Sequence, residues 1–319
     1  MMSYRFSLFV PFSILFSNEV AAADSPMPLR IYAQSPEQSI SLENQLRSAF
    51  PISNNGVELF ASGTIASIWA NSDVADLDYY QNHVFAGMNW HVTQNLQAEL
   101  KFQYTYAADN RLDTLTIDFH DMFSIDQNGR DKVPKHQFNI SSIYGNEIHD
   151  FKGETLVRAL HGYMQYHLFM SGPHALAVGG SLYYKNVGDG PFKDSAFEQG
   201  AQINYSYSAG PHSIFTTAGL VHRDDDTILI DAHVKDTTTT FAIGYGFKFG
   251  GIHEVHLEYY WYEGFLSDDS AFSKPSTEVV LGYRLNLGNT VLELATVENM
   301  GLADNSTDIA FMFGIRSFL

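Results

Sequence analysis

Cysteine is absent from this sequence. That absence excludes a disulfide framework and any metal site built from thiolates. Basic residues are also scarce: 18 Lys and Arg stand against 36 Asp and Glu, which leaves a formal net charge of −18. Such an acidic chain matches the phosphate backbone of nucleic acid poorly, so we expect no nucleic acid among its partners.

Long apolar runs are missing as well. After the N-terminus there is no stretch of about 18 apolar residues, the length that a bilayer-spanning helix needs. Nevertheless, 45% of the 319 residues are hydrophobic. Only helices and closed barrels satisfy every backbone hydrogen bond within lipid. A membrane-spanning form of this chain must therefore be a β-barrel.

The N-terminus has the parts of a secretory signal. Arg5 precedes a short apolar stretch, and three consecutive alanines offer a cleavage site before Asp24. We predict a signal peptide over residues 1–23, export to the outer membrane, and a periplasmic N-terminal segment over residues 24–55. The alternative is an N-terminal anchor that is not removed.

Apolar and polar residues alternate with a period of two in many segments. Residues 96–106 read LQAELKFQYTY, and the pattern recurs over 197–208 and 277–287. A helix would place these polar residues on its apolar face, whereas a strand separates the two kinds. The segments are roughly 10 to 14 residues long, which is what a tilted strand needs to cross the outer membrane. A soluble β-sandwich, the alternative, would need shorter strands.

Tight turns with Gly, Pro or Asn alternate with longer polar connections, as in single-chain outer-membrane barrels. The longer connections are 71–80, 109–153, 187–196, 224–237, 265–274 and 299–307. The breaks between them predict strands near 56–70, 81–92, 95–108, 155–170, 174–186, 197–209, 213–223, 238–250, 252–264, 275–287, 290–298 and 308–318. We predict an all-β, up-and-down, antiparallel transmembrane β-barrel of about twelve strands over residues 56–319, with both termini in the periplasm. Ten or fourteen strands are the alternatives.

Three stretches resemble a family of uncharacterised proteobacterial proteins known as domain of unknown function 3187. They are PLRIYAQSP at 28–36, IDFHDMF at 117–123 followed by QNGRDKVP at 127–134, and ENMGLADNSTDIAFMFGIRSFL at 298–319. The resemblance implies an outer-membrane barrel and supplies no reaction. The alternating last strand also resembles the insertion signal of such barrels. The barrel-assembly machinery is thus an expected partner, together with outer-membrane lipid and lipopolysaccharide.

The residue patterns of outer-membrane enzymes are weak or missing. A lipid-hydrolysing barrel would carry a His-x-Ser motif, and no such motif occurs in this sequence. Three sets of His and Asp could belong to a protease site on the rim, but neighbours on a strand point to opposite faces. These sets are His120 with Asp121, His149 with Asp150, and His222 with Asp224, Asp225 and Asp226. Lys135 stands where a calcium loop that began at Ser124 would need its glutamate. We expect no enzyme, no metal and no cofactor; a rim hydrolase is the alternative.

The alternation also predicts which side chains face the lumen. The charged and histidine residues expected there are Glu99, Lys101, His161, Glu198, Lys248, His256, Glu258, Glu278, Arg284 and Arg316. Such a set can line a water-filled pore, or it can pair off and plug the barrel. We favour a narrow passive channel for small polar or charged solutes. The alternative is a closed structural or assembly-related barrel that binds a partner.

The longest connection, 109–153, carries an approximate helical apolar stripe from Leu112 to Phe123. An apolar helix exposed at the cell surface is unfavourable, so we expect this loop to fold inward and narrow the lumen. Its constriction residues would be Asp118, His120, Asp121 and Arg130. The alternative is a loop that folds over the rim or docks on a neighbouring chain.

Overall fold

Strands form nearly all of the regular structure. The computed structural model describes residues 25–319 except 53–55, 73, 113, 115–116, 118–131, 144–146, 225–226, 229–231, 268–269, 300–304 and 306. The strands are β1 (Val57–Asn71), β2 (Ala75–His91), β3 (Leu96–Ala107), β4 (Asn139–Ser142), β5 (Glu147–His149), β6 (Thr155–Ser171), β7 (His174–Val187), β8 (Asp194–Ala209), β9 (His212–Arg223), β10 (Thr227–Ile228), β11 (Ala232–His233), β12 (Thr237–Phe249), β13 (His253–Tyr262), β14 (Ser276–Leu287), β15 (Thr290–Asn299) and β16 (Thr307–Phe318). The named helices are α1 (Pro36–Ser39) and the 3-10 helix η2 (Ala271–Ser273). No helix in the described part of the chain has both the length and the apolar character needed to cross a membrane.

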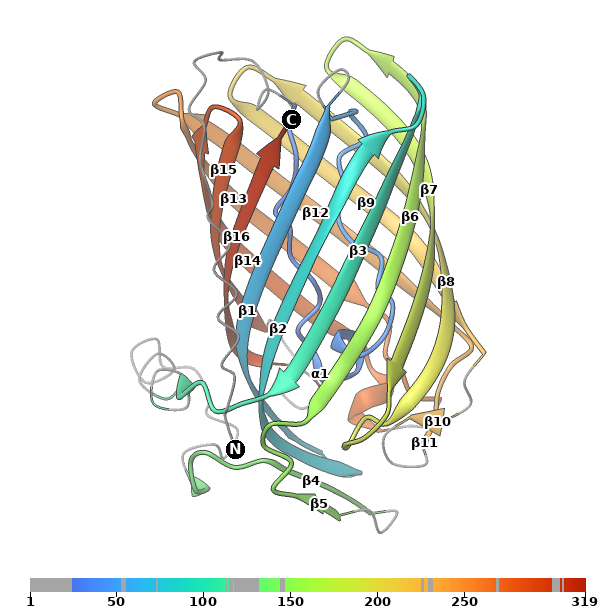
Figure 1. Ribbon diagram of the computed structural model, residues 1–319, viewed down its shortest axis with the longest axis vertical. Coiled ribbons are helices and arrows are strands. Elements are labelled where there is room, and N and C mark those ends of the chain that lie inside the picture. The colour runs from blue at the N-terminus through green and yellow to red at the C-terminus, as the bar shows by residue number, and fades with distance from the viewer. Residues whose placement is uncertain are drawn as a thin grey trace, which may run out of the picture.

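Twelve of the fourteen strands in the main sheet close into an antiparallel barrel (Figure 1). Each barrel strand pairs with the barrel strands before and after it in the chain, and β1 pairs with both β2 and β16, which closes the ring. The prediction of a twelve-stranded up-and-down barrel is confirmed, and the ten- and fourteen-stranded barrels and the soluble sandwich are wrong. In Figure 1 the short turns lie at the end where the C-terminus is marked, and the long connections lie at the opposite end.

The two faces of the wall have the polarity of a membrane barrel. On β3, Leu100 and Phe102 point outward and are 46% and 49% exposed, whereas Glu99, Lys101 and Gln103 point inward and are buried. Outward apolar and inward polar side chains follow the same alternation along the other barrel strands. Such a surface is stable in lipid, which covers the apolar band.

β2 is longer than predicted, so the expected polar connection over 71–80 is wrong. Asn71 pairs with Asp76, which leaves only a tight turn in which the Ser72 hydroxyl bonds to the Ala75 carbonyl. The first residues of β2 extend past the barrel, and β4 pairs with them from Ala75 to Asp78. The β4–β5 hairpin therefore continues the wall outward, as the lower part of Figure 1 shows. The predicted inward path of the connection 109–153 concerns its apolar stretch from Leu112 to Phe123, most of which lies outside the described residues.

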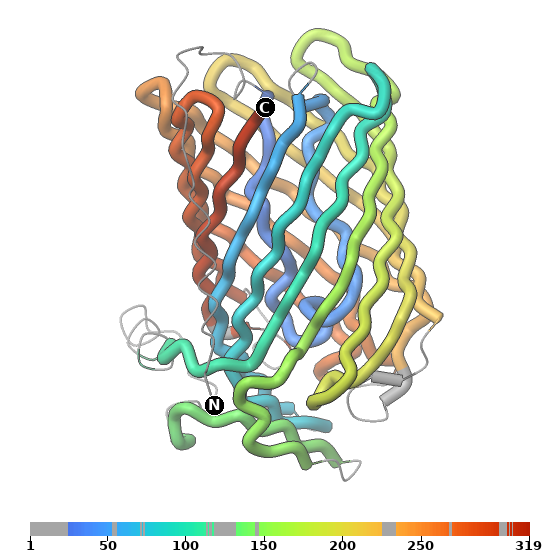
Figure 2. Tube along the Cα trace, viewed as in Figure 1, coloured from blue at the N-terminus to red at the C-terminus, as the bar shows by residue number. Residues whose placement is uncertain are grey.

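Residues 25–52, the N-terminal segment, lie inside the barrel. Figures 1 and 2 show that the segment enters the barrel at the end of the short turns and runs towards the opposite end. It reverses there, near α1, and returns to the end of the short turns. Twenty of these 28 residues are buried, the other eight are half-buried, and none is exposed. The prediction of a periplasmic segment over 24–55 is thus wrong for Met27–Ile52. The physical reason is the polar inner wall, because a chain without regular structure offers that wall free amide and carbonyl groups.

Candidate functional site

The lumen wall holds the residues that the alternation assigned to it. Nine are buried, and Lys248 is half-buried beside a short turn; the nine are Glu99, Lys101, His161, Glu198, His256, Glu258, Glu278, Arg284 and Arg316. They do not form one site but several clusters around the N-terminal segment. The predicted constriction residues Asp118, His120, Asp121 and Arg130 lie outside the described residues.

The first cluster joins two arginines of the segment to two wall glutamates. Arg30 donates to Glu58 through Nη2 at 2.7 Å and Nε at 3.2 Å, and it also pairs with Glu99. Arg47 donates to both oxygens of Glu99, at 2.9 and 3.0 Å. Two-point contacts of this kind fix the orientation of a planar guanidinium as well as its position.

The second cluster lies near the short turns, where wall arginines hold the start of the segment. Arg284 donates to the carbonyls of Met27 and Pro28 at 2.8 Å each, and it pairs with Glu293 at 2.7 Å. Arg316 bonds to the same Pro28 carbonyl at 3.1 Å. Each guanidinium thus satisfies a backbone acceptor of the segment and a wall carboxylate at once.

The third cluster lies towards the opposite end. Arg223 pairs with Glu43 of the segment and with Glu198 of the wall, at 3.2 Å each. Glu198 also accepts the Leu42 amide at 2.8 Å and the Ser41 hydroxyl at 2.5 Å. A buried charge is tolerated only when it is paired in this way.

Wall carboxylates further serve as acceptors for amides of the segment. Glu258 accepts the Leu29 amide at 2.8 Å, and Glu278 accepts the amides of Gln34 and Ser35 at 2.7 and 2.8 Å. Buried backbone donors require such partners. Six wall glutamates on six different strands contact donors of the segment: Glu58, Glu99, Glu198, Glu258, Glu278 and Glu293.

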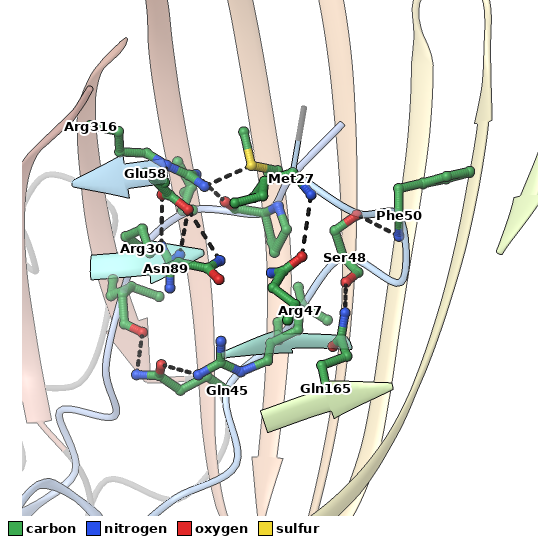
Figure 3. A pocket seen from close by; sticks show the side chains of 16 residues that line it. Met27, Arg30, Gln45, Arg47, Ser48, Phe50, Glu58, Asn89, Gln165 and Arg316 are labelled. Atoms are coloured by element: carbon green, nitrogen blue, oxygen red, sulfur yellow. Dashed lines mark hydrogen bonds and ion pairs between the residues drawn. The ribbon is translucent and has the colours of Figure 1, made fainter. Parts of the chain in front are cut away.

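The fit is close in places and loose in one. A Cβ added to Gly282 of β14 would lie 2.3 Å from Leu29 Cδ1, so a larger residue there would force the Leu29 side chain to move. Between the two arms of the segment a pocket remains near the short turns; it is open to solvent, and its empty space of about 480 Å³ includes part of that solvent. Figure 3 shows Arg30 and Arg316 on one side of this pocket and Gln165 on the other.

Burial and charge shift the pKa values of groups in the segment. Burial raises the pKa of Glu43 from its ordinary value of 4.5 to about 7, and the Arg223 guanidinium offsets part of that shift. Burial alone would lower the pKa of Arg30, but the Glu58 and Glu99 carboxylates raise it. Arg30 is therefore a permanent cation, whereas Glu43 titrates near neutral pH.

Sequence reasoning missed the partners that the segment meets. Arg30, Arg47 and Glu43 lie in a stretch with no periodicity, so nothing marked them as buried. Glu293 interrupts an apolar run, yet its side chain lies on the inward face of β15 between those of Val291 and Ala295, which are also buried. Its position in the alternation along β15 could therefore have identified it as a lumen residue.

Enzyme-like pairs are incomplete. His161 Nε2 lies 3.0 Å from Ser181 Oγ on the adjacent strand, a pair with no signature in the sequence. Its Nδ1 is buried without a hydrogen-bond partner among the described residues, so no carboxylate orients the ring as a triad requires. On the rim, His222 and Asp224 are 3.2 Å apart, with side chains 52% and 75% exposed, so they form only a solvated pair. The described residues hold no group of His, Asp and Glu that could bind a metal ion.

Solved structures with a similar fold are barrels of the outer membrane. The COG4313 outer membrane channel from Pseudomonas putida F1 aligns with a TM-score of 0.52 and 8% identity over 94% of this chain and 100% of that one. The NanC porin gives a TM-score of 0.47 and 10% identity over 82% and 99% of the two chains. The toluene transporter TodX from P. putida gives 0.39 and 11% over 85% and 90%. At such low identity the likeness concerns the fold alone.

Sequence comparison assigns the family. No curated protein is significantly similar in sequence. The profile of the family described as Protein of unknown function (DUF3187) matches residues 6–318, nearly the whole chain, in agreement with the resemblance of the three stretches. The chain therefore belongs to the DUF3187 family.

Proposed function

We propose that this protein is an outer-membrane channel for small polar or charged solutes and that its own N-terminal segment closes the lumen in this structure. The observation that carries the proposal is the chemistry of the inner wall. That wall is lined with charged and polar side chains on every side of the segment. Water can solvate such a wall when the segment leaves, as it does in open porins.

The barrel does not depend on the segment for its strand pairing. The ring of backbone pairs from β1 through β16 closes without it. If the lumen only had to be filled, apolar side chains would serve at least as well, since replacing buried ion pairs by apolar groups is often neutral or stabilising. A polar interface instead suits a wall and a segment that come apart, because water can then solvate both surfaces.

The signal-like N-terminus, the apolar outer belt and the C-terminal strand support residence in the outer membrane, with lipid around the belt. Contacts with lipopolysaccharide and with the barrel-assembly machinery belong to the same proposal. The constriction by Asp118, His120, Asp121 and Arg130 is a separate proposal. We assign closure to the N-terminal segment, because the described β4–β5 hairpin extends the wall instead.

Conductance in planar bilayers tests this function. The full chain should be closed or should open rarely, and a variant that lacks residues 25–52 should show stable open steps. The chain has no cysteine, and Ala49 of the segment belongs to one cluster of buried alanines with Ala177 of β7, so the pair Ala49→Cys and Ala177→Cys offers a disulfide that would hold the segment in place. The disulfide should abolish openings, and a reductant should restore them.

The same measurement addresses the closed structural barrel, the alternative function. A deletion variant that migrates as a folded, heat-modifiable barrel and yet stays silent at all voltages would sink the channel and favour that alternative. Silence of the full chain alone would not, since the segment blocks the lumen.

A further inference from the structure

The two guanidinium groups of the N-terminal segment occupy sites of the same composition. The Arg30 guanidinium sits in the fork of Glu58, with its carbon 4.0 Å from the centre of the Phe60 ring. That of Arg47 sits in the fork of Glu99, 3.7 Å from the Tyr163 ring centre. Each site thus combines a carboxylate that accepts two N–H donors with the face of an aromatic ring.

Both sites belong to the barrel wall and not to the segment. Glu58 and Phe60 lie on β1, Glu99 on β3 and Tyr163 on β6, and β1, β2, β3 and β6 are successive neighbours in the sheet. Glu99 links the two sites, because it also pairs with Arg30. The pair of sites would therefore remain, next to each other, after the segment leaves the lumen.

Departure of the segment changes the charge balance at these sites. Glu99 would lose both of its arginine partners, whereas Glu58 would keep Arg316, whose Nε lies 2.7 Å from Oε1. Lys101 lies on the same strand as Glu99, with its Nζ 4.7 Å from the centre of the Tyr32 ring of the segment and 5.3 Å from that of the Phe85 ring of the wall. In a water-filled lumen Lys101 would be solvated as a cation. Its positive charge would partly offset the negative charge of the freed Glu99 carboxylate. Weak binding is what a conducting site requires, since the solute has to leave again.

We infer that the open lumen binds solutes that carry a guanidinium group, and that Arg30 and Arg47 occupy the positions of such solutes in the closed state. This inference rests on the proposed channel function and names its substrate class. A planar guanidinium uses both oxygens of a carboxylate fork and stacks on an aromatic face, which a spherical inorganic cation does not. Anionic solutes would be repelled by the freed carboxylates.

Chemical rescue in the full chain tests one site without any need for the channel to open. Arg47→Ala leaves a gap between Glu99 and Tyr163 and should lower the temperature at which the protein unfolds in detergent. Methylguanidinium at millimolar concentration should raise that temperature again by about 2 °C or more. Potassium at equal ionic strength should not. Arg47→Ala combined with Glu99→Gln should show no rescue.

A second measurement uses the open barrel that lacks residues 25–52. Methylguanidinium should block its potassium current, and Glu99→Gln should weaken this block about tenfold, the effect of losing about 1.4 kcal/mol of binding free energy. Asp194→Asn is the matched control, because it also removes one carboxylate from the lumen wall, but near the opposite end and beside Lys185. The control should leave the block unchanged.

The outcomes separate the two proposals. A deletion variant that conducts potassium but is not blocked by methylguanidinium overturns the substrate class and leaves the channel in place. A silent deletion variant overturns the channel function. Equal rescue of Arg47→Ala by potassium and by methylguanidinium shows a site for any cation, which also overturns the inference.

Discussion

The N-terminal segment and the connection 109–153 are both polar stretches with little regular structure, yet they lie in opposite places. The segment runs through the lumen and is almost entirely buried. The β4–β5 hairpin of the connection lies outside the lumen, where β4 pairs with the protruding end of β2. The two regions differ in the groups to which their backbones form hydrogen bonds. The segment meets inward carboxylates, and the connection meets an open strand edge.

The charged side chains of the two regions differ in burial and therefore in their need for a partner. Arg47 of the segment is 9% exposed, and both Glu99 oxygens accept its N–H groups. Glu147 of the β4–β5 hairpin is 73% exposed and only approaches His149, at 3.7 Å. Water replaces a missing partner in the hairpin but not in the lumen. Equal substitutions should therefore have very unequal effects.

Glu99→Gln should produce the largest effect. It leaves two buried guanidinium groups short of a partner, and breaking a buried pair on one side costs about 3–5 kcal/mol. The loss should fall on docking of the segment, since strand pairing does not involve the Glu99 carboxylate. Trypsin should then cleave after Arg30 and Arg47 faster by a factor on the order of 100 to 5,000.

Glu147→Gln is the control, since it makes the same chemical change on an exposed side chain. It should leave the cleavage of both regions as in the unmodified protein. If the two substitutions speed cleavage of the segment equally, or neither does, then the ion pairs of the lumen do not hold the segment in place.

The comparison also explains what the sequence could and could not reveal. The sequence predicts most strand limits to within about three residues. One face of the wall meets lipid and the other meets the lumen, so apolar and polar residues alternate along each strand with a period of two. β2 was the exception, since Asp76 and Asp78 made its protruding start look like a loop. The place of the segment could not be read, because its arginines find partners 28 to 69 residues away in the chain. No local pattern encodes such pairs.

A pH dependence sharpens the comparison and should be smaller. The docked segment holds Glu43, whose pKa is raised by burial to about 7, whereas a released, solvated carboxyl titrates near its ordinary 4.5. Between these values the docked state binds more protons than the released one. Docking should therefore strengthen as the pH falls from about 7 to about 4.5 and weaken as the pH rises through 7. Each pH unit in this window corresponds to at most about 1.4 kcal/mol.

Protection of the segment from trypsin, corrected for the protease's own pH profile on an unfolded substrate, measures this effect. The groups that face Glu43 are Arg223, Thr240, Glu198, Glu278, Tyr32 and Tyr262. Glu43→Gln keeps the size of the side chain and removes its titration, so the protection of that variant should vary less with pH. Protection that increases with rising pH would contradict the assignment.

Deleting residues 112–132 from the connection should have the smallest effect. The deletion leaves β4, β5 and their pairing with Ala75–Asp78 in the chain, and the N-terminal segment is held by hydrogen bonds to glutamates of barrel strands. Conductance of the full chain and antibiotic sensitivity of intact cells should therefore stay close to those of the unmodified protein. In the barrel that already lacks residues 25–52, the deletion separates two positions of the loop. A loop on the rim predicts an unchanged open step, and an inward loop predicts a larger one. An increase in the full chain as large as that caused by removing the segment would place the barrier in the connection and reverse the comparison.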